Sequence, residues 1–270
     1  MDDLKKITGG FDETAQMPLL FVGHGSPMNA IEENKFVKGW RDAALAIQKP
    51  GAILCISAHW ETDGTLVTAM EKPRTIHDFG GFPKELFEVQ YPAAGSPELA
   101  NLTQILVKSA HVYPDENWGL DHGCWSVINR MYPDADIPVV QLSLDHSRPG
   151  IYHFELAKEL KALRKLGILI IGSGNIVHNL RKINWNNPDG GFDWAEEANV
   201  GFKKMIQNGE YDKLANIQEM SPSYRLAVPT PEHYNPLLYI LGLKEENEEC
   251  VFFNDEIVLG SISMTSIKIS

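Results

Sequence analysis

Short, uninterrupted apolar runs recur along the chain, and longer segments with helical periodicity lie between them. Two of the clearest runs cover residues 18–22 and 52–56. Runs of this length, rich in aliphatic side chains, are typical of strands buried on both faces of a parallel sheet. The same pattern predicts further strands at residues 65–69, 138–142, 168–172, 250–253 and 257–269.

Apolar residues spaced three and four positions apart predict the helices. Such segments cover residues 34–46, 97–109, 125–131, 152–166, 194–208 and 236–241. Because strands alternate with helices over the whole length, we expect an α/β fold, a single-domain sandwich with a largely parallel central sheet. The last predicted strand, 257–269, alternates apolar and small polar residues, as an edge or antiparallel strand does.

No repeat, low-complexity stretch or linker divides the sequence. We therefore expect a polar N-terminal segment over residues 1–16 and one domain over residues 17–270. No apolar run approaches the ~20 residues that span a bilayer, and the first 16 residues lack the apolar core of a secretory signal. These features predict a cytoplasmic protein that does not associate with membranes.

Charge and cysteine content exclude further classes of protein. The 24 basic and 36 acidic residues give a formal net charge of −12, without a basic block. Phosphate backbones repel such a surface, so no nucleic-acid partner is expected. The three cysteines are far apart in the sequence, which argues against a disulfide framework or a zinc knuckle.

Three of the strand-like runs are followed by a histidine, and this repetition points to chemistry. His24 and His59 come at the ends of the first two runs, and His178 comes shortly after the run at 168–172. In open α/β sheets, ligands gather beyond the carboxyl ends of the strands. Several imidazoles delivered to that edge predict a metal site, although each alone has a plain structural alternative as a turn or cap residue.

Two further histidines have informative neighbours. His122 follows Asp121, which we expect to cap the helix that begins there, and the ring is either functional or a solvated first-turn side chain. His233 lies in a proline-rich loop beside Glu232, a rival ligand. His77 lies in a glycine-rich aromatic loop that is expected to border a pocket. The remaining histidines, His111, His146 and His153, are expected to be structural or solvated.

Six motifs in order along the chain resemble one family. They are GHGSPM (23–28), SAHWE (57–61), TIHDFGGFP (75–83), LDHGCW (120–125), GSGNIVHNL (172–180) and TPEHYNPLLY (230–239). The set resembles the class III extradiol ring-cleavage dioxygenases of the LigB-like superfamily and, within them, the DOPA 4,5-dioxygenase branch. The resemblance runs from about Pro18 to the C-terminus.

The resemblance implies a catalytic domain with one metal at the ligand edge of its sheet. By position, His24 and His59 match the two strand-end ligands of the family, and His233 matches the third ligand of this branch. His178 matches an active-site histidine that serves as a further metal ligand or as an acid/base, and His122 matches the second acid/base histidine. In the wider superfamily the third ligand is a glutamate. An all-histidine set suits zinc as well as iron, so the expected cofactor is one divalent metal, Fe(II) for activity or Zn(II) as bound.

The expected function is cleavage of the aromatic ring of a DOPA-like catechol with O2, giving a muconic semialdehyde. The expected partners are the small-molecule catechol and O2, and the protein is expected to be a monomer or a small homo-oligomer. A zinc-dependent hydrolase that uses the same histidines and a non-catalytic metal-binding relative remain as alternatives. An amino-acid substrate needs a partner for its carboxylate, and Arg74 and Arg181 are the candidates.

Overall fold

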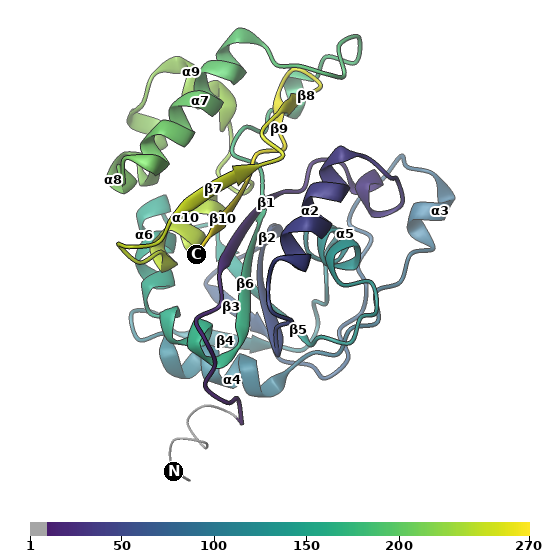
Figure 1. Ribbon diagram of the computed structural model, residues 1–270, viewed down its shortest axis with the longest axis vertical. Coiled ribbons are helices and arrows are strands. Elements are labelled where there is room, and N and C mark those ends of the chain that lie inside the picture. Colours follow the sequence, from purple (N-terminus) through teal and green to yellow (C-terminus); the bar gives the residue numbers. More distant parts are fainter. Residues whose placement is uncertain (1–9) are drawn as a thin grey trace.

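A mixed β-sheet crosses the centre of the molecule, and helices cover both of its faces (Figure 1). The structure is a computed structural model and describes residues 10–270. Within these residues the sheet has eight strands in the order β4-β3-β5-β2-β6-β1-β10-β7, and β8 and β9 form a separate small hairpin. The strands are β1 (Leu19–Gly23), β2 (Ala52–Thr62), β3 (Thr65–Thr68), β4 (Val112–Asp115), β5 (Val139–Asp145), β6 (Ile168–Gly174), β7 (Cys250–Phe253), β8 (Ile257–Val258), β9 (Ile262–Ser263) and β10 (Ser266–Ile269).

The four central strands run parallel. β6 pairs in parallel with β1 and β2, and β2 pairs in parallel with β5. β10 pairs antiparallel with both β1 and the edge strand β7. The predicted α/β sandwich, with a largely parallel sheet and an antiparallel C-terminal strand, is therefore confirmed.

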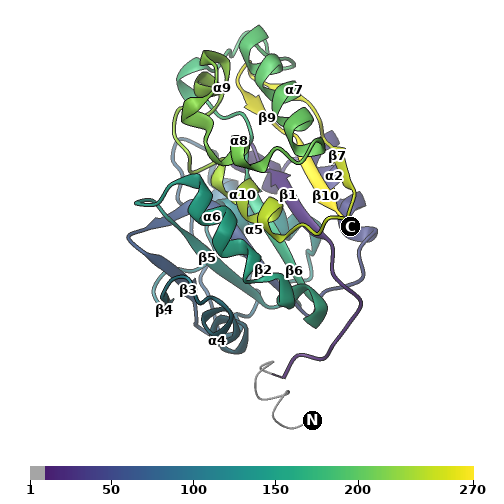
Figure 2. The ribbon, with the colours of Figure 1, turned by 90° about the vertical axis from the view of Figure 1, so that its left-hand side faces the viewer.

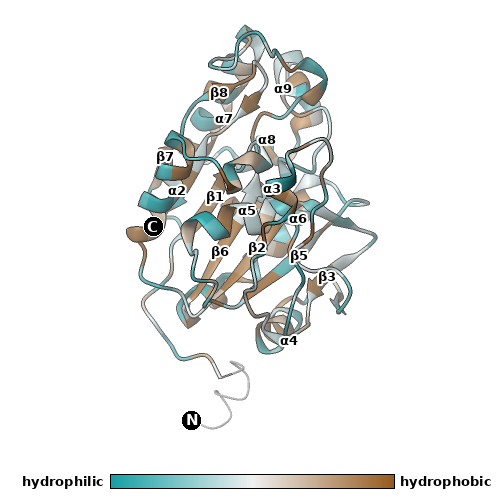
Figure 3. Ribbon diagram, turned by 90° about the vertical axis from the view of Figure 1, so that its right-hand side faces the viewer, coloured by the Kyte–Doolittle hydropathy of each residue, from teal (hydrophilic) through white to brown (hydrophobic). Residues whose placement is uncertain are grey.

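Alternating side chains of each central strand enter two separate cores. In β1, Leu19 and Phe21 pack on one side of the sheet, whereas Leu20 and Val22 pack on the other. Both sets are buried, which explains why the strands read as continuous apolar runs in the sequence. In Figure 3 the central strands β1, β2 and β6 are accordingly coloured as hydrophobic over most of their length.

Helices α6 and α10 cover one face of the sheet, and α2 and α5 cover the other (Figures 1 and 2). The helices are α2 (Lys35–Leu45), α3 (Lys84–Phe87), α4 (Pro97–Leu106), α5 (His122–Met131), α6 (Gly150–Lys158), α7 (Asp193–Gln207), α8 (Tyr211–Ala215), α9 (Pro222–Ala227) and α10 (Asn235–Leu243). Short 3-10 turns are η1 (Pro27–Ala30), η2 (Lys161–Leu166), η3 (Leu180–Lys182) and η4 (Ile217–Glu219).

Two predicted elements are wrong as single pieces. The strand predicted at 257–269 is broken into β8, β9 and β10, because Leu259 and Gly260 adopt positive φ values of 51° and 80° and turn the chain. The helix predicted at 152–166 ends at Lys158 and gives way to the 3-10 turn η2. The capping prediction is confirmed, because the Asp121 side chain accepts a hydrogen bond from the Cys124 backbone N–H at the start of α5.

The N-terminal segment lies only partly within the structure. Residues 1–9 of the predicted segment 1–16 fall outside the described residues, and the boundary at residue 16 stays a prediction. Thr14 and Met17 donate backbone hydrogen bonds to Lys165 and Arg164, so the described part of the segment runs along η2. Within residues 10–270, no helix has both the length and the apolar character that a bilayer span requires.

Candidate metal centre

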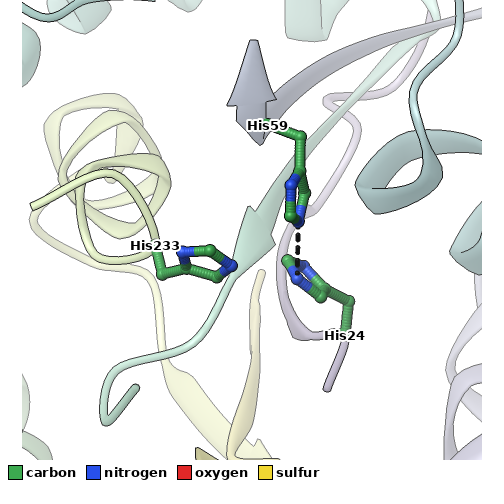
Figure 4. Close-up of side chains that lie close together, drawn as sticks. All are labelled: His24, His59 and His233. Atoms are coloured by element: carbon green, nitrogen blue, oxygen red, sulfur yellow. Dashed lines mark hydrogen bonds between the residues drawn. The ribbon is translucent and has the colours of Figure 1, made fainter. Parts of the chain in front are cut away.

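Three histidines from distant parts of the chain meet at the carboxyl edge of the sheet (Figure 4). His24 follows β1, His59 lies near the end of β2, and His233 lies in the loop before α10. One ring nitrogen from each lies within 4.8 Å of the others, and the Nε2 atoms of His24 and His59 are 3.2 Å apart. Figure 4 shows the three rings directed toward one point.

Local chain geometry brings His24 and His59 to this point. β1 ends at Gly23, so His24 projects from the chain just beyond the sheet. His59, by contrast, lies within β2, which continues to Thr62 past a register shift against β5 between Ile56 and Glu61. The prediction that the second strand stops at its histidine is therefore wrong, and His59 lies within the stretch of β2 where the register shifts, an irregularity of the kind that changes the direction of side chains.

The Nδ1 atom of each of the three rings faces a side-chain oxygen. His24 Nδ1 lies 3.0 Å from Ser173 Oγ, and His233 Nδ1 lies 3.2 Å from Glu232 Oε1. His59 Nδ1 lies 3.5 Å from a carboxylate oxygen of Asp78. Partners of this kind hold the proton on Nδ1 and leave the lone pair on Nε2 free, which is the tautomer that binds a metal.

Burial keeps these rings neutral. The pKa values of His24 and His233 lie well below the ordinary histidine value, because both rings are buried and lie among other histidines. Burial and the neighbouring His122 lower the pKa of His59 to about 3. Several neutral imidazoles with convergent lone pairs are a donor set that fits a divalent metal such as Zn(II) or Fe(II).

Two more histidines complete the cluster. The ring of His178 stacks on that of His233, with the centroids 3.5 Å apart and the planes inclined by 10°. Burial lowers the pKa of His178 to about 4. The ring of His122 lies 3.8 Å from that of His59, centroid to centroid. His122 opens α5, whose N-terminus can approach β2 because residue 123 is glycine: a Cβ there would lie 2.8 Å from the His59 ring.

A cavity of about 650 Å³ opens in front of the histidines. All five line it, together with apolar side chains from the loop after β3, from η1 and from the β8–β9 hairpin. Among the described residues, its charged lining other than histidine consists of Lys35 and Asp189. The apolar side chains of the lining are Pro27, Met28, Phe36, Phe79, Phe82, Leu180, Ile183, Trp185, Pro188, Val258, Leu259, Ile262 and Met264. A mostly apolar cavity with a few convergent polar groups is the usual form of a small-molecule site.

Comparison with known proteins decides the family. The chain matches, over residues 17–260, the family described as the catalytic LigB subunit of aromatic ring-opening dioxygenase. The chain belongs to the LigB family. Members of this family are metal-dependent dioxygenases that open aromatic rings. Membership therefore confirms the predicted class of enzyme and does not favour the hydrolase or the non-catalytic alternative.

Proteins similar in sequence match nearly the whole chain. A protein of Escherichia coli (strain K12) named 4,5-DOPA dioxygenase extradiol is 46% identical over 260 residues, which are 95% of this chain and 96% of that protein. A Beta vulgaris protein of the same name is 39% identical over 92% of this chain and 94% of its own length. The crystal structure of an uncharacterized protein of Escherichia coli K12 gives a TM-score of 0.83 at 42% identity, covering 94% of this chain and 100% of that chain.

The structure places the residues predicted for this LigB-family site as follows. His24, His59 and His233 converge, while His178 and His122 flank them. The loop 75–83 borders the cavity through Phe79 and Phe82, as expected. The remaining histidines, His77, His111, His146 and His153, do not line the cavity, and neither do Arg74 and Arg181.

Sequence reasoning missed two partners of the rings. Asp78 stands directly after His77, to which the sequence drew attention, and Ser173 directly follows the predicted strand at 168–172, within the GSGNIVHNL motif. The only signal for either was its place inside a motif. Their partners are 44 and 149 residues away in the sequence, so the contacts follow from the fold.

Proposed function

We propose that the chain is an Fe(II)-dependent extradiol dioxygenase whose substrate is a catechol with an amino-acid-like side chain. The convergence of three neutral, Nδ1-anchored histidines on a mostly apolar cavity carries the proposal. His24, His59 and His233 would hold the metal, and bound Fe(II) would supply a site at which the catechol and O2 meet. Both atoms of O2 enter the product as one ring C–C bond breaks, giving a muconic semialdehyde.

The chain's own residues would bind the ring and move protons. Phe79 and Phe82 line the cavity and would pack against an aromatic substrate. His122 and His178 are placed to take a proton from a phenolic oxygen and to return it, since a neutral imidazole has one nitrogen lone pair that can accept a proton. His178 stacks on His233, and a role as acid/base rather than as a fourth ligand fits that parallel arrangement.

Recognition of the substrate's polar end would fall to the two charged residues of the lining. The Lys35 ammonium would donate to a substrate carboxylate, and the Asp189 carboxylate would accept from a substrate ammonium group. Lys35 also forms an ion pair with Glu256, the residue that precedes β8. The relatives named for 4,5-DOPA support such a substrate. These two residues take the place of Arg74 and Arg181 in the prediction.

The deciding experiment measures O2 consumption. Protein stripped of metal is reconstituted anaerobically with Fe(II), or with Zn(II) in parallel, and then mixed with L-DOPA and O2. We expect one O2 per substrate with iron alone and a product whose mass is that of L-DOPA plus two oxygen atoms. Absence of uptake across a panel of catechols, despite one tightly bound iron per chain, would overturn the proposal. A cytoplasmic location and a monomeric or small homo-oligomeric state stay predictions of the sequence.

A further inference from the structure

The Asp78 carboxylate lies between two rings of the histidine cluster. Its Oδ2 atom is 2.9 Å from His122 Nδ1 and 3.5 Å from His59 Nδ1. Its Oδ1 atom accepts a hydrogen bond of 2.9 Å from the backbone N–H of His122. One carboxylate therefore contacts both a candidate metal ligand and a candidate acid/base, although it does not itself line the cavity.

The short distance to His122 identifies which ring nitrogen carries the proton. A carboxylate oxygen and an unprotonated imidazole nitrogen are both acceptors and repel each other at 2.9 Å. The proton must therefore be on Nδ1, and Nε2 is the basic atom. The contact is bent, because no acceptor lies in line with the Nδ1–H, so it acts more through charge than as a linear hydrogen bond.

The Nδ1 atom of His59 faces the same carboxylate, at 3.5 Å. Its Nε2 lies 3.2 Å from Nε2 of His24, a separation that suits two nitrogen ligands of one metal ion. A carboxylate behind a ligating imidazole fixes the ring's orientation and makes the ligand more basic. Asp78 thus stands in the relation to His59 that Glu232 has to His233.

Asp78 is itself held in place by the loop that carries it. The backbone N–H of Ile76 donates to the carbonyl of Leu120, and the indole N–H of Trp125 donates to the carbonyl of Ile76. These bonds tie the segment before Asp78 to both sides of His122. The side chain is 20% exposed, so water weakens its charge only in part.

We propose that Asp78 is a positioning residue that sets the tautomer and orientation of both His59 and His122. It raises the metal affinity of the site through His59 and directs the basic Nε2 of His122 to the cavity. The part that concerns His122 rests on the proposed function, whereas the part that concerns metal affinity does not.

The test compares Asp78→Asn with Asp63→Asn, a matched control in the exposed turn after β2, the strand that carries His59. Zn(II) affinity is measured by competition with a chromophoric chelator, which needs no turnover. Loss of such an outer partner typically weakens metal binding about 10–100-fold, and we expect that range for Asp78→Asn. The control should stay within about twofold of the wild type, because its side chain is remote from the rings.

Two further measurements separate positioning from a merely structural role. Nitrogen NMR of the imidazoles should show Nδ1 protonation of His59 and His122 in the wild type and a mixture of tautomers in Asp78→Asn. In steady-state assays of the iron enzyme, kcat should fall while KM for the catechol changes little. Asp78→Glu, which keeps the charge, should recover part of the metal affinity and decides the matter if Asp78→Asn does not fold.

Zn(II) affinity within twofold of wild type in a folded Asp78→Asn, with unchanged tautomers, would overturn the proposal. If the wild type cleaves no catechol at all, the proposed function fails, yet the affinity and tautomer measurements still decide the role of Asp78.

Discussion

Each converging histidine faces an oxygen of a different residue: the Ser173 hydroxyl for His24, and the carboxylates of Asp78 and Glu232 for His59 and His233. Ser173 Oγ in turn donates to the Gly123 carbonyl at 2.5 Å, so the hydroxyl must accept from His24 rather than donate to it. The orientation of each ring is thus fixed from behind. Removing a ring should therefore remove the metal, since the remaining two cannot shift to replace it.

We expect His24→Ala, His59→Ala and His233→Ala each to lose stoichiometric metal and ring cleavage together. His122→Ala should keep the metal and lose only about 10²–10⁴-fold in rate, the usual contribution of an acid/base group. His111→Ala, at an exposed position beside Tyr113, is the control. Metal analysis of the purified variants measures the bound metal, and an O2 electrode measures the rate of ring cleavage. A full complement of metal together with full activity in His24→Ala would contradict the assignment of His24 as a ligand.

Lys35 provides a second prediction at this scale. Lys35→Met should raise KM about tenfold or more for catechols that bear a carboxylate, because a charge-assisted hydrogen bond is lost. KM for dopamine and 4-methylcatechol, which have no carboxylate, should hardly change. Lys38→Met is the control, since Lys38 lies on the same helix and pairs with Asp42 outside the cavity. Equal KM values for L-DOPA in both variants would exclude Lys35 as the carboxylate partner.

The residues that the sequence could reveal were those that carry their own context. His24 follows an apolar run and a Gly-Ser-Pro turn follows it, so local pattern was enough. Asp78 has no such context, because its role exists only when the loop 75–83 packs against the start of α5. Lys35 likewise reaches the cavity only through the position of α2 beside the β8–β9 hairpin, which a sequence pattern does not specify.

At the scale of elements, the pattern of apolar residues predicted helices and strands correctly where both faces of the element are buried. It failed where the chain turns. β6 and α10 are apolar on all sides and were predicted. β4 was missed, because Tyr113 and Pro114 lie at an exposed edge and give no apolar run. The break after β8 depends on the positive φ of Leu259, a residue type that seldom adopts that conformation and so gives no turn signal.

The contact between α6 and α10 contains a titratable group that should make stability depend on pH. His153 on α6 is fully buried, and its Nδ1 lies 3.4 Å from the hydroxyl of Tyr239 on α10. Burial lowers its pKa to about 4, against the opposite effect of Asp145. At pH values below the ordinary histidine pKa of about 6.5, His153 is protonated in the unfolded chain but stays neutral in the folded protein. The free energy of unfolding therefore falls as the pH falls toward 4.

His153→Gln removes this group. We expect the loss of unfolding free energy between pH 7 and pH 5 to shrink by about 2 kcal/mol relative to the wild type. Urea unfolding at several pH values measures the difference. His146→Gln, at an exposed position, should leave the wild-type pH dependence in place. Parallel pH profiles for His153→Gln and the wild type would contradict the argument.

At the scale of the whole molecule, one buried arginine joins three segments. The Arg164 side chain, 1% exposed, donates to the carbonyls of Met17 and Leu243 and pairs with Glu248. It therefore ties the segment before β1 to η2 and to the chain after α10. We expect Arg164→Leu to lower the free energy of unfolding by about 3–5 kcal/mol, because a buried carboxylate loses its partner.

Lys158→Leu is the matched control for this prediction. Lys158 is on α6 and pairs with Glu155, but both side chains are exposed. Exposed pairs contribute at most about 1 kcal/mol, so this variant should unfold near the wild-type urea concentration. Similar midpoints of urea unfolding for the two variants would mean that the contacts of Arg164 do not contribute to the free energy of unfolding.

The three converging histidines belong to segments that are far apart in the sequence, and a bound ion would therefore act as a cross-link. An ion bound only by the folded state, at 1,000 times its dissociation constant, adds about 4.1 kcal/mol to stability. We expect a chelator to lower the melting temperature of the loaded protein in a concentration-dependent way, and to leave that of His24→Ala unchanged. Scanning calorimetry with and without chelator measures this. In a cell short of the metal, newly made chains would then lose durability as well as activity, so metal supply would set how much of this protein persists.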